Sequence, residues 1–359
     1  DRATGGWERY HIAAARGVMS LLGASNMRGG DFLFAGTIPA GSGLSSSSAL
    51  VVASALGLLA VNGREEPALR LADLLATAER FVGTRSGGMD QAVCLLAEAG
   101  HVLRIDFDPL RTRAIGIPAG CSFVVCHSMV PAEKSGAAQA AYNHRVLECT
   151  LACRALEHAL ADVLPRSVRH FGDLLALLPE RSPPELVEVL ANSLPPRPLE
   201  EREVCALIGG AIDKLFAGAA STSARAATYA LLKRATHVFT EADRVDRAEA
   251  ALRAGDWAGL GVLMDASHAS CRDDYEVSCA ELEELVAAAK QAGALGARLT
   301  GAGFGGCTVN LVRGTDVPLF CTMLERMFYQ PRGIKNAANH CFEVVPSAGA
   351  RVVRVAGEV

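Results

Sequence analysis

The chain has 359 residues, enough for two domains, and half of them are hydrophobic, so a large core can form. Lys and Arg number 35 and Asp and Glu 39, which gives a net charge of −4, and no basic tract favours nucleic acid or an anionic membrane as a partner. No apolar run approaches the ~18 residues of a membrane span. The eleven scattered cysteines form no C-x-x-C pair, which argues against a zinc knuckle and predicts reduced thiols in a cytoplasmic protein.

In the first part of the chain, hydrophobic periodicity predicts helices and strands in alternation. Aromatic and apolar residues from Trp7 to Val18 recur at helical spacing, and the apolar run 50–60 is long enough for a buried helix. An amphipathic helix is expected over 67–81 and a further short helix over 92–97. Strands are expected over 31–38, 101–107 and 121–127.

The second part is expected to be richer in helix. Helices are predicted over 139–160, 222–252, 256–270 and 279–292, with short helices and linkers in the proline-rich stretch 165–198. Strands are predicted over 307–312, 342–345 and 351–355. The sum is an α+β protein with mixed sheets rather than regular βαβ alternation, and the expected domains are residues 1–160 and 161–359.

The stretch 39–49, PAGSGLSSSSA, stands directly before the apolar helix 50–60. Small residues let backbone N–H groups approach an anion, and the positive end of the helix dipole favours negative charge there. Serine hydroxyls add donors or become oxygen ligands for Mg²⁺. The loop therefore predicts a phosphate site, with a flexible loop that merely caps a helix as the alternative.

Two carboxylates further along the chain have two interpretations each. Asp90 follows two glycines, so it could take a proton from an attacking hydroxyl group, or it could simply cap the next helix. Glu79 lies near the end of its helix, where it could reach a metal ion held by the serine loop or could be solvated.

Two further constellations stand later in the chain. Residues 301–306, GAGFGG, fit G-x-G-x-x-G by spacing, but a helix is expected before them and a strand after them, the reverse of a dinucleotide site. A loop that packs against a phosphate or against the other glycine loop is favoured, with a tight helix-to-strand turn as the alternative. The polar cluster around Ser267 and His268 lacks G-x-S-x-G, so a structural or substrate-lining role is preferred to a hydrolase.

Together these segments resemble the galactokinase branch of the kinases named for galactokinase, homoserine, mevalonate and phosphomevalonate kinases. The similarity rests on PAGSGLSSSSA at 39–49, GGMDQ at 87–91 and LTGAGFGGCTV at 299–309, and SHASCRDDYEVSC at 267–279 is typical of galactokinases. It implies an N-terminal domain like domain 2 of ribosomal protein S5, a ferredoxin-like C-terminal domain, and a cytoplasmic, monomeric kinase that uses ATP and Mg²⁺.

The resemblance also implies a role for individual residues. Asp90 would be the catalytic base or electrostatic partner of the sugar C1 hydroxyl, beside Gly87 and Tyr142 as sugar-lining residues. Mg²⁺ would be held by Ser47 and Glu79. The expected ATP-binding residues are Trp7 and Tyr10 near the adenine, and Gly41, Gly43, Ser45, Ser46, Ser47, Ser48, Gly301, Gly303 and Gly305 around the phosphates.

The expected substrate is galactose or N-acetylgalactosamine. The serine loop, GGMDQ and the stretch 145–149 look most like N-acetylgalactosamine kinases, whereas Tyr142 looks more like galactose-specific members. The alternatives are a non-catalytic sugar and ATP sensor that binds a regulatory protein, and a dehydrogenase that uses 301–306. The family's first motif, of the GRxNLIGEHTDY kind, is absent, so the chain is expected to be a fragment that is inactive alone.

Overall fold

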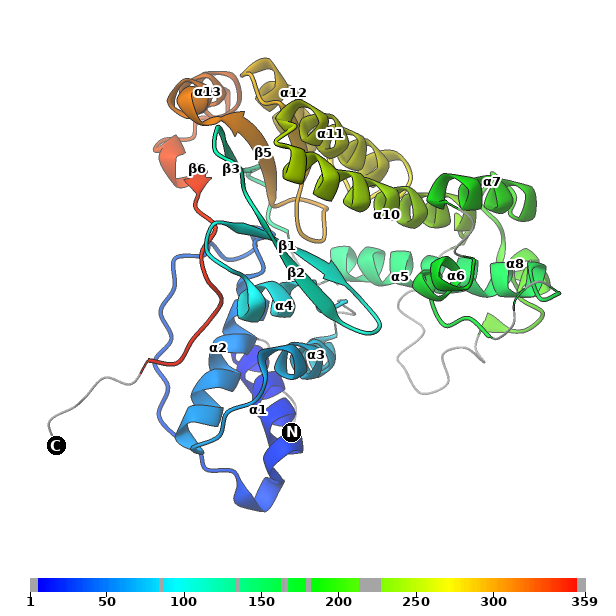
Figure 1. Ribbon diagram of the computed structural model, residues 1–359, viewed down its shortest axis with the longest axis horizontal. Helices are drawn as coiled ribbons and strands as arrows, with labels where there is room; N and C mark the ends of the chain where they lie inside the picture. The colour runs from blue at the N-terminus through cyan, green and yellow to red at the C-terminus, as the bar shows by residue number, and fades with distance from the viewer. Residues whose placement is uncertain are drawn as a thin grey trace, which may run out of the picture. The chain divides into compact units, whose positions relative to one another are not determined.

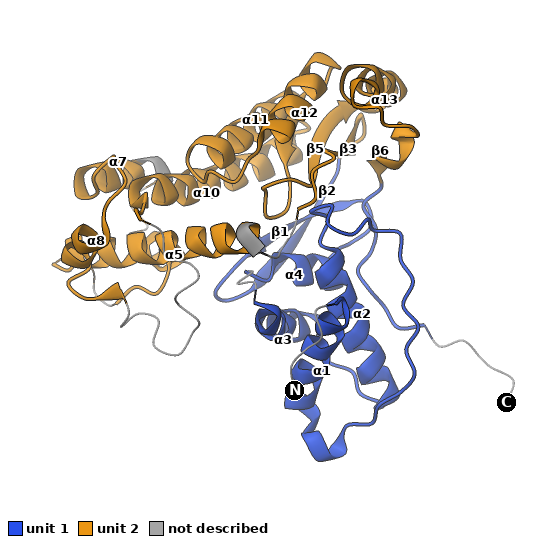
Figure 2. Ribbon diagram, turned by 180° about the vertical axis from the view of Figure 1, so that it is seen from behind, with its two compact units in different colours: residues 1–117, 345–359 blue, residues 118–344 orange. Residues whose placement is uncertain are grey.

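The computed structural model describes residues 6–83, 87–132, 136–162, 164, 167–178, 182–212 and 227–353 (Figure 1). Two compact units emerge, one formed by residues 1–117 with 345–359 and the other by 118–344 (Figure 2). Residues 118–160 pack with the second unit because strand β3 (Cys121–His127) pairs there with two later strands. The two compact units therefore do not coincide with the expected domains 1–160 and 161–359. The domain boundary at residue 160 stays a prediction.

The first unit is built on four helices, α1 (Glu8–Leu22), α2 (Ser46–Val61), α3 (Ala68–Glu79) and α4 (Met89–Leu96). Their apolar faces form one core, to which α2 contributes both Val51 and Leu58. Strands β1 (His101–Asp106) and β2 (Arg111–Gly116) form an antiparallel hairpin. The short turns η1 (Ala24–Asn26) and η2 (Arg80–Val82) follow α1 and α3.

The strand predicted over 31–38 is wrong, because these residues form no ladder within the described part of the chain. The alternation of side chains that suggested a strand nevertheless places alternate residues on the helix α1. Phe32 and Phe34 stack at 6.3 Å between ring centroids and both lie against His11 of α1, while Leu33 between them is 97% exposed. The strand expected over 351–355 is also not formed at 351–353, and 354–355 lie outside the described residues.

The second unit contains a four-stranded antiparallel sheet in the order β4-β5-β3-β6. Besides β3, its strands are β4 (Gly296–Leu299), β5 (Cys307–Arg313) and β6 (Cys341–Val344). Helices α12 (Ala280–Gln291) and α13 (Val317–Leu324) and the π-helical turn η5 (Glu325–Tyr329) share a core with it. The 3₁₀ turns are η4 (Gly314–Asp316), η6 (Gln330–Arg332) and η7 (Ala337–Asn339).

The rest of the second unit is helical. The long helices α5 (Gly136–Ala159), α10 (Leu231–Ala254) and α11 (Trp257–Asp273) confirm the helices predicted over 139–160, 222–252 and 256–270, although residues 222–226 of the second prediction lie outside the described part. The proline-rich stretch holds α6 (Phe171–Leu177) and α7 (Pro183–Ser193), and α8 (Glu201–Leu207) follows. The α+β class is thus confirmed.

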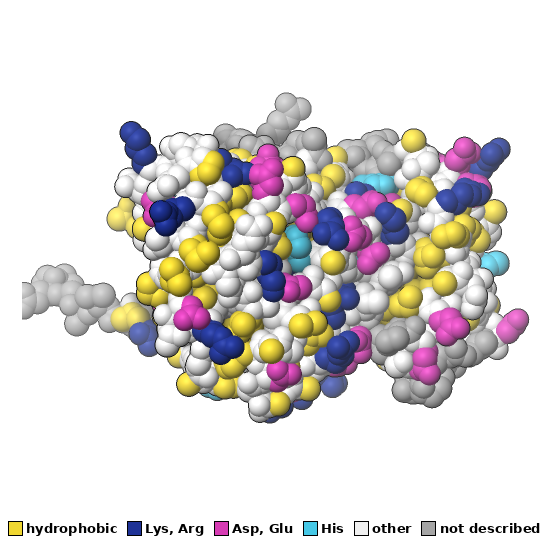
Figure 3. Space-filling model, turned by 90° about the horizontal axis from the view of Figure 1, so that it is seen from above, with side chains coloured by type: hydrophobic (Ala, Val, Ile, Leu, Met, Phe, Trp, Pro, Cys, Tyr) yellow, Lys and Arg dark blue, Asp and Glu magenta, His cyan; other side chains and the backbone are white. Residues whose placement is uncertain are grey.

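On the face drawn in Figure 3, basic and acidic side chains alternate over the surface rather than gathering into one basic patch. Among the described residues, no helix is both long enough and apolar enough to cross a membrane.

Candidate active site

The serine loop folds as a chain of tight turns that ends at the first residue of α2. Gly41, Gly43 and Ser45 all take left-handed backbone conformations, with φ of 67°, 73° and 56°. Ser42 is buried and donates to the Pro39 carbonyl over 2.7 Å, which holds the turn. Ser45 is the N-cap of α2 but its side chain caps no amide. The positive end of α2 is therefore available to an anion.

Behind the loop lies a buried polar cluster. Ser48, in the first turn of α2, donates to Glu79 Oε2 over 2.9 Å, and Gln91 of α4 donates to the same oxygen. All three side chains are at most 2% exposed. Glu79 as a solvated helix residue is therefore wrong, since its carboxylate is withdrawn from water and held by two donors from different helices.

Ser47, which was expected at the metal beside Glu79, has a different neighbour. It hydrogen-bonds Tyr10 of α1, and burial together with the Glu79 charge raises the pKa of that phenol. The serine whose hydroxyl touches Glu79 is Ser48. Tyr10 thus lies beside the serine loop, whereas Trp7 is 55% exposed and makes an edge contact with Phe34 at 5.7 Å.

Asp90 lies inside the first turn of α4, one residue after its first residue Met89. The interpretation of Asp90 as the N-cap is wrong, because Gly88 occupies that position with φ 92°. A Cβ at Gly88 would come within 2.8 Å of Ala76 Cβ, so only glycine fits where α4 begins against α3. Gly87, the other expected sugar residue of this turn, is exposed.

Asp90 and Glu79 act on one neighbour. Burial, Asp90 and Glu79 together raise the pKa of the Cys94 thiol on α4 to about 11. Asp90 and Glu79 therefore both lie near Cys94, and the first unit combines a helix N-terminus, a buried carboxylate and a second carboxylate at the start of α4.

The glycine-rich segment 301–306 connects β4 to β5. The helix expected before it is present as α12 but does not lead directly into the segment, because the strand β4 intervenes, and β5 follows where a dinucleotide site needs a helix. Phe304 N–H donates to the Val277 carbonyl over 2.6 Å and Gly306 N–H to the Val130 carbonyl over 2.8 Å. A Cβ at Gly303 would overlap the Val277 carbonyl, so the loop lies directly on its neighbours.

The polar groups of α11 are engaged in structural contacts. Ser267 donates to Glu241 over 2.6 Å, and His268 Nδ1 accepts from Leu299 N–H of β4 over 3.3 Å. Burial lowers the pKa of His268 although Glu283 faces it at 3.1 Å. These contacts favour the structural interpretation of this cluster over a nucleophile–base pair.

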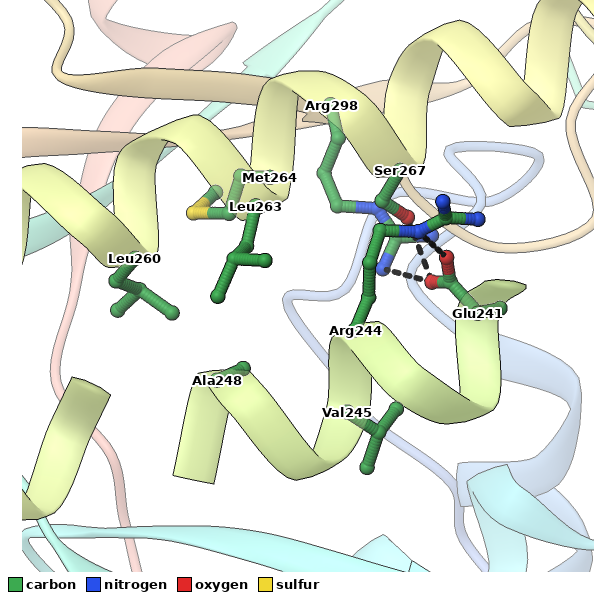
Figure 4. Close-up of a pocket in the computed structure, with 9 residues that line it drawn as sticks. All are labelled: Glu241, Arg244, Val245, Ala248, Leu260, Leu263, Met264, Ser267 and Arg298. Carbon is green, nitrogen blue, oxygen red and sulfur yellow. Dashed lines mark hydrogen bonds and ion pairs between the residues drawn. The ribbon is translucent and has the colours of Figure 1, made fainter. Parts of the chain in front are cut away.

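A small cavity of about 110 Å³ lies between α10 and α11 beside Arg298 of β4 (Figure 4). One end is apolar, and at the other end Glu241 accepts from Ser267 and from Arg244 Nε, the latter over 2.6 Å. None of the residues expected to bind ATP or sugar is among its lining, which comprises Glu241, Arg244, Val245, Ala248, Leu260, Leu263, Met264, Ser267 and Arg298.

Tyr142, expected at the sugar, is half-buried on α5. It lies near Tyr275, whose pKa is raised by burial and by its neighbours Cys149 and Tyr142. Of the predicted residues, Tyr10 and the serines lie together with Glu79 in the first unit, while Tyr142 and the 301–306 loop belong to the second.

Comparison with known proteins identifies the family. Residues 9–98 match the GHMP kinases N terminal domain and residues 248–330 the GHMP kinases C terminal domain. A galactokinase from Dictyostelium discoideum is 32% identical over 97% of this chain and 75% of its own length. The chain belongs to the galactokinase branch of the GHMP kinase family. It is a phosphotransferase whose acceptor is an alcohol group.

Other galactokinases support this placement. The enzyme from Chloroflexus aggregans is 37% identical over 88% of this chain and 68% of its own. The crystal structure of Lactococcus lactis galactokinase complexed with galactose superposes with a TM-score of 0.71 at 25% identity, covering 98% of this chain and 78% of that one. This galactokinase-branch chain therefore spans about three quarters of the length of the Dictyostelium discoideum and Lactococcus lactis galactokinases.

Gln91 is the site residue that sequence reasoning missed. It stands beside Asp90 in GGMDQ and looks like an ordinary helix residue, yet it is fully buried and donates to Glu79. Its Oε1 atom is buried with no hydrogen-bond partner among the described residues. A glutamine on the buried side of a short helix, beside the apolar residues Ala92 and Leu95, was the available signal.

Proposed function

We propose that this kinase transfers the γ-phosphoryl group of ATP to the anomeric hydroxyl of galactose. The observation that carries the proposal is the serine loop, which ends at an uncapped helix N-terminus directly in front of the buried Ser48–Glu79–Gln91 cluster. The galactokinase names of its relatives support galactose as the sugar. They do not support N-acetylgalactosamine or a non-catalytic sensor, so neither is proposed.

The triphosphate is proposed to bind the turns at Gly41 and Gly43 and the hydroxyls of the four serines, Ser45 to Ser48. Left-handed turns present successive N–H groups to one side, and the α2 dipole adds a positive potential there. The loop at Gly301, Gly303 and Gly305 is proposed to close on the phosphates. Trp7 and Tyr10 remain the proposed neighbours of the adenine.

The donor set behind the loop suits Mg²⁺. Serine hydroxyl, carboxylate and amide oxygens are hard ligands, and Gln91 Oε1 is a buried oxygen that finds no hydrogen-bond partner in the part of the chain that the structure describes. Within the described residues no group of three or more His, Cys, Asp or Glu gathers, which fits an ion held by one carboxylate and substrate phosphates. Ser48 replaces Ser47 as the serine proposed to act with Glu79. Bound Mg²⁺ would neutralise charge on the phosphates.

Asp90 is proposed to accept the proton of the anomeric hydroxyl as it attacks the γ-phosphorus in line. In phosphoryl transfer most of the catalysis comes from positioning and charge stabilisation, so a fixed carboxylate at the start of α4 suffices. Gly87 and Tyr142 are proposed to line the sugar. The rigid glycine turn before α4 would hold Asp90 in place.

Kinetics of the full-length protein test this function. Incubation with ATP, Mg²⁺ and single sugars should release ADP with galactose, and ³¹P NMR should show a sugar 1-phosphate. Glucose and N-acetylgalactosamine serve as comparison sugars, because they differ from galactose at C4 and at the 2-substituent. If none of the hexoses supports ADP release, the proposal is refuted. If N-acetylgalactosamine is turned over and galactose is not, the sugar must be reassigned.

A further inference from the structure

A buried ionic network links three elements of the second unit. Arg234 of α10 is 1% exposed, and its guanidinium reaches Glu148 Oε2 of α5 and Glu276 Oε2, each over 2.6 Å. Glu148 is also 1% exposed and further accepts from Ala230 N–H over 2.7 Å. The two carboxylates compensate the loss of water around this buried guanidinium.

The network holds the segment 274–279, which connects α11 to α12. Arg234 donates to the Asp274 carbonyl, and Arg145 of α5 donates to the Glu276 carbonyl over 3.4 Å. Lys233 adds a contact of 2.8 Å to the Glu276 carboxylate. Glu276 itself takes a left-handed conformation with φ 55°, which a non-glycine residue adopts only when its surroundings fix it.

The next residue carries this restraint to the third glycine-rich loop. Val277 is 3% exposed, its N–H donates to the Cys271 carbonyl over 3.0 Å, and its carbonyl accepts the Phe304 N–H. Gly303 packs so closely on Val277 that no side chain fits between them. A shift of Val277 therefore moves the 301–306 loop, because two backbones in contact offer no flexible side chain to absorb it.

We propose that Glu148, Arg234 and Glu276 are positioning residues that set the 301–306 loop for the nucleotide phosphates. The inference rests on the proposed function, in which this loop closes on the phosphates. Glu148 lies on the helix that also carries Tyr142, six residues earlier. The network thus fixes the loop relative to the helix that is proposed to line the sugar, within one unit.

The test compares Glu276→Gln with Glu157→Gln in the full-length protein. Glu276 is partly exposed, so its amide variant should fold. Glu157 is a matched control on α5, where it pairs with Arg154 at 2.6 Å and accepts from Val168 N–H, outside the 274–279 segment. Glu276→Gln should raise the KM for ATP at least threefold and change the KM for galactose less than twofold. Glu157→Gln should change neither.

Hydrogen–deuterium exchange separates this inference from the proposed function. Peptides covering 300–308 should exchange faster in Glu276→Gln than in the wild type and in Glu157→Gln, whatever the substrate is. Equal exchange in all three proteins would overturn the inference even if galactose is phosphorylated. If exchange is faster in Glu276→Gln but the wild-type protein phosphorylates no hexose, the positioning of the loop by the network is supported and the galactokinase activity is refuted. If Glu276→Gln raises the KM for ATP and the KM for galactose equally, the network has only a structural role and the inference is overturned.

Discussion

Replacing Glu148 by glutamine tests how the second unit is held together. The substitution keeps the shape of the side chain but removes a charge that is 1% exposed and faces Arg234 over 2.6 Å. Burial opposes ionisation of Glu148, yet hydrogen bonds from His144 and Arg234 and the charge of Arg234 lower its pKa from 4.5 to about 2. The variant leaves Arg234 buried with one carboxylate instead of two.

The size of the effect follows from that pKa. A fall from 4.5 to about 2 corresponds to about 3 kcal/mol of stability at neutral pH. Breaking a buried ion pair by removing one partner costs about 3–5 kcal/mol, which agrees. For a unit of this size the midpoint of thermal unfolding should fall by roughly 6–12 °C.

The pH dependence has a definite sign. Because the folded-state pKa of Glu148 lies below its unfolded value, its contribution is fully present well above pH 4.5 and is lost as the pH falls towards 2. The stability difference between wild type and Glu148→Gln should therefore shrink to about 2 kcal/mol at pH 3.5. Urea unfolding from pH 7 to pH 3.5 measures it.

A matched control guards against a general effect of glutamine. Glu188 on α7 is exposed, and Glu188→Gln should change the free energy of unfolding by less than about 0.5 kcal/mol. A loss below about 1 kcal/mol in Glu148→Gln, or a difference that grows as the pH falls, would refute the reasoning.

Three further predictions concern single sites. Ser48→Ala should lower the free energy of unfolding, measured in urea, by about 1–3 kcal/mol, because Glu79 loses a hydrogen-bond donor. The same variant should weaken Mg²⁺-dependent ATP binding in calorimetry. The control Ser54→Ala should leave the free energy of unfolding unchanged, since that buried hydroxyl has no partner among the described residues. Gly303→Ala should lower the unfolding midpoint by several degrees, because its φ is 79° and the added Cβ would overlap Val277, whereas Gly314→Ala has ordinary room. Iodoacetamide at pH 8, followed by mass spectrometry, should leave unmodified the buried thiols of Cys153 and Cys307, whose pKa burial raises to about 12. Rapid alkylation of either thiol would contradict its burial.

Local pattern predicted the helices well because each buries a regular face of its own. The apolar run 50–60 became α2, which begins four residues earlier at Ser46, and the periodicity at 67–81 became α3, which begins one residue later at Ala68. Strands depend on partners distant in the chain, so pattern was weaker there. Phe32 and Phe34 alternate as in a strand but pack on His11 instead, and β4, only four residues long, escaped notice.

The site was predictable in its motifs but not in its contacts. Four successive serines look alike in sequence, and only the turn of α2 decides that Ser48 and not Ser47 touches Glu79. Glu79 could be read as solvated because its burial depends on α2 and α4 covering it. Gln91 was missed for the same reason, since its partner lies twelve residues earlier on another helix.

The measurement that tests the central claim most directly is the turnover of Asp90→Asn with ATP and galactose. Loss of the proton acceptor should lower kcat by about 10²–10⁴-fold while the dissociation constant for ATP stays within twofold, because the serine loop is untouched. Asp73→Asn, at an exposed position on α3, should keep wild-type kcat. An Asp90→Asn protein that keeps more than a tenth of the wild-type kcat would contradict the account.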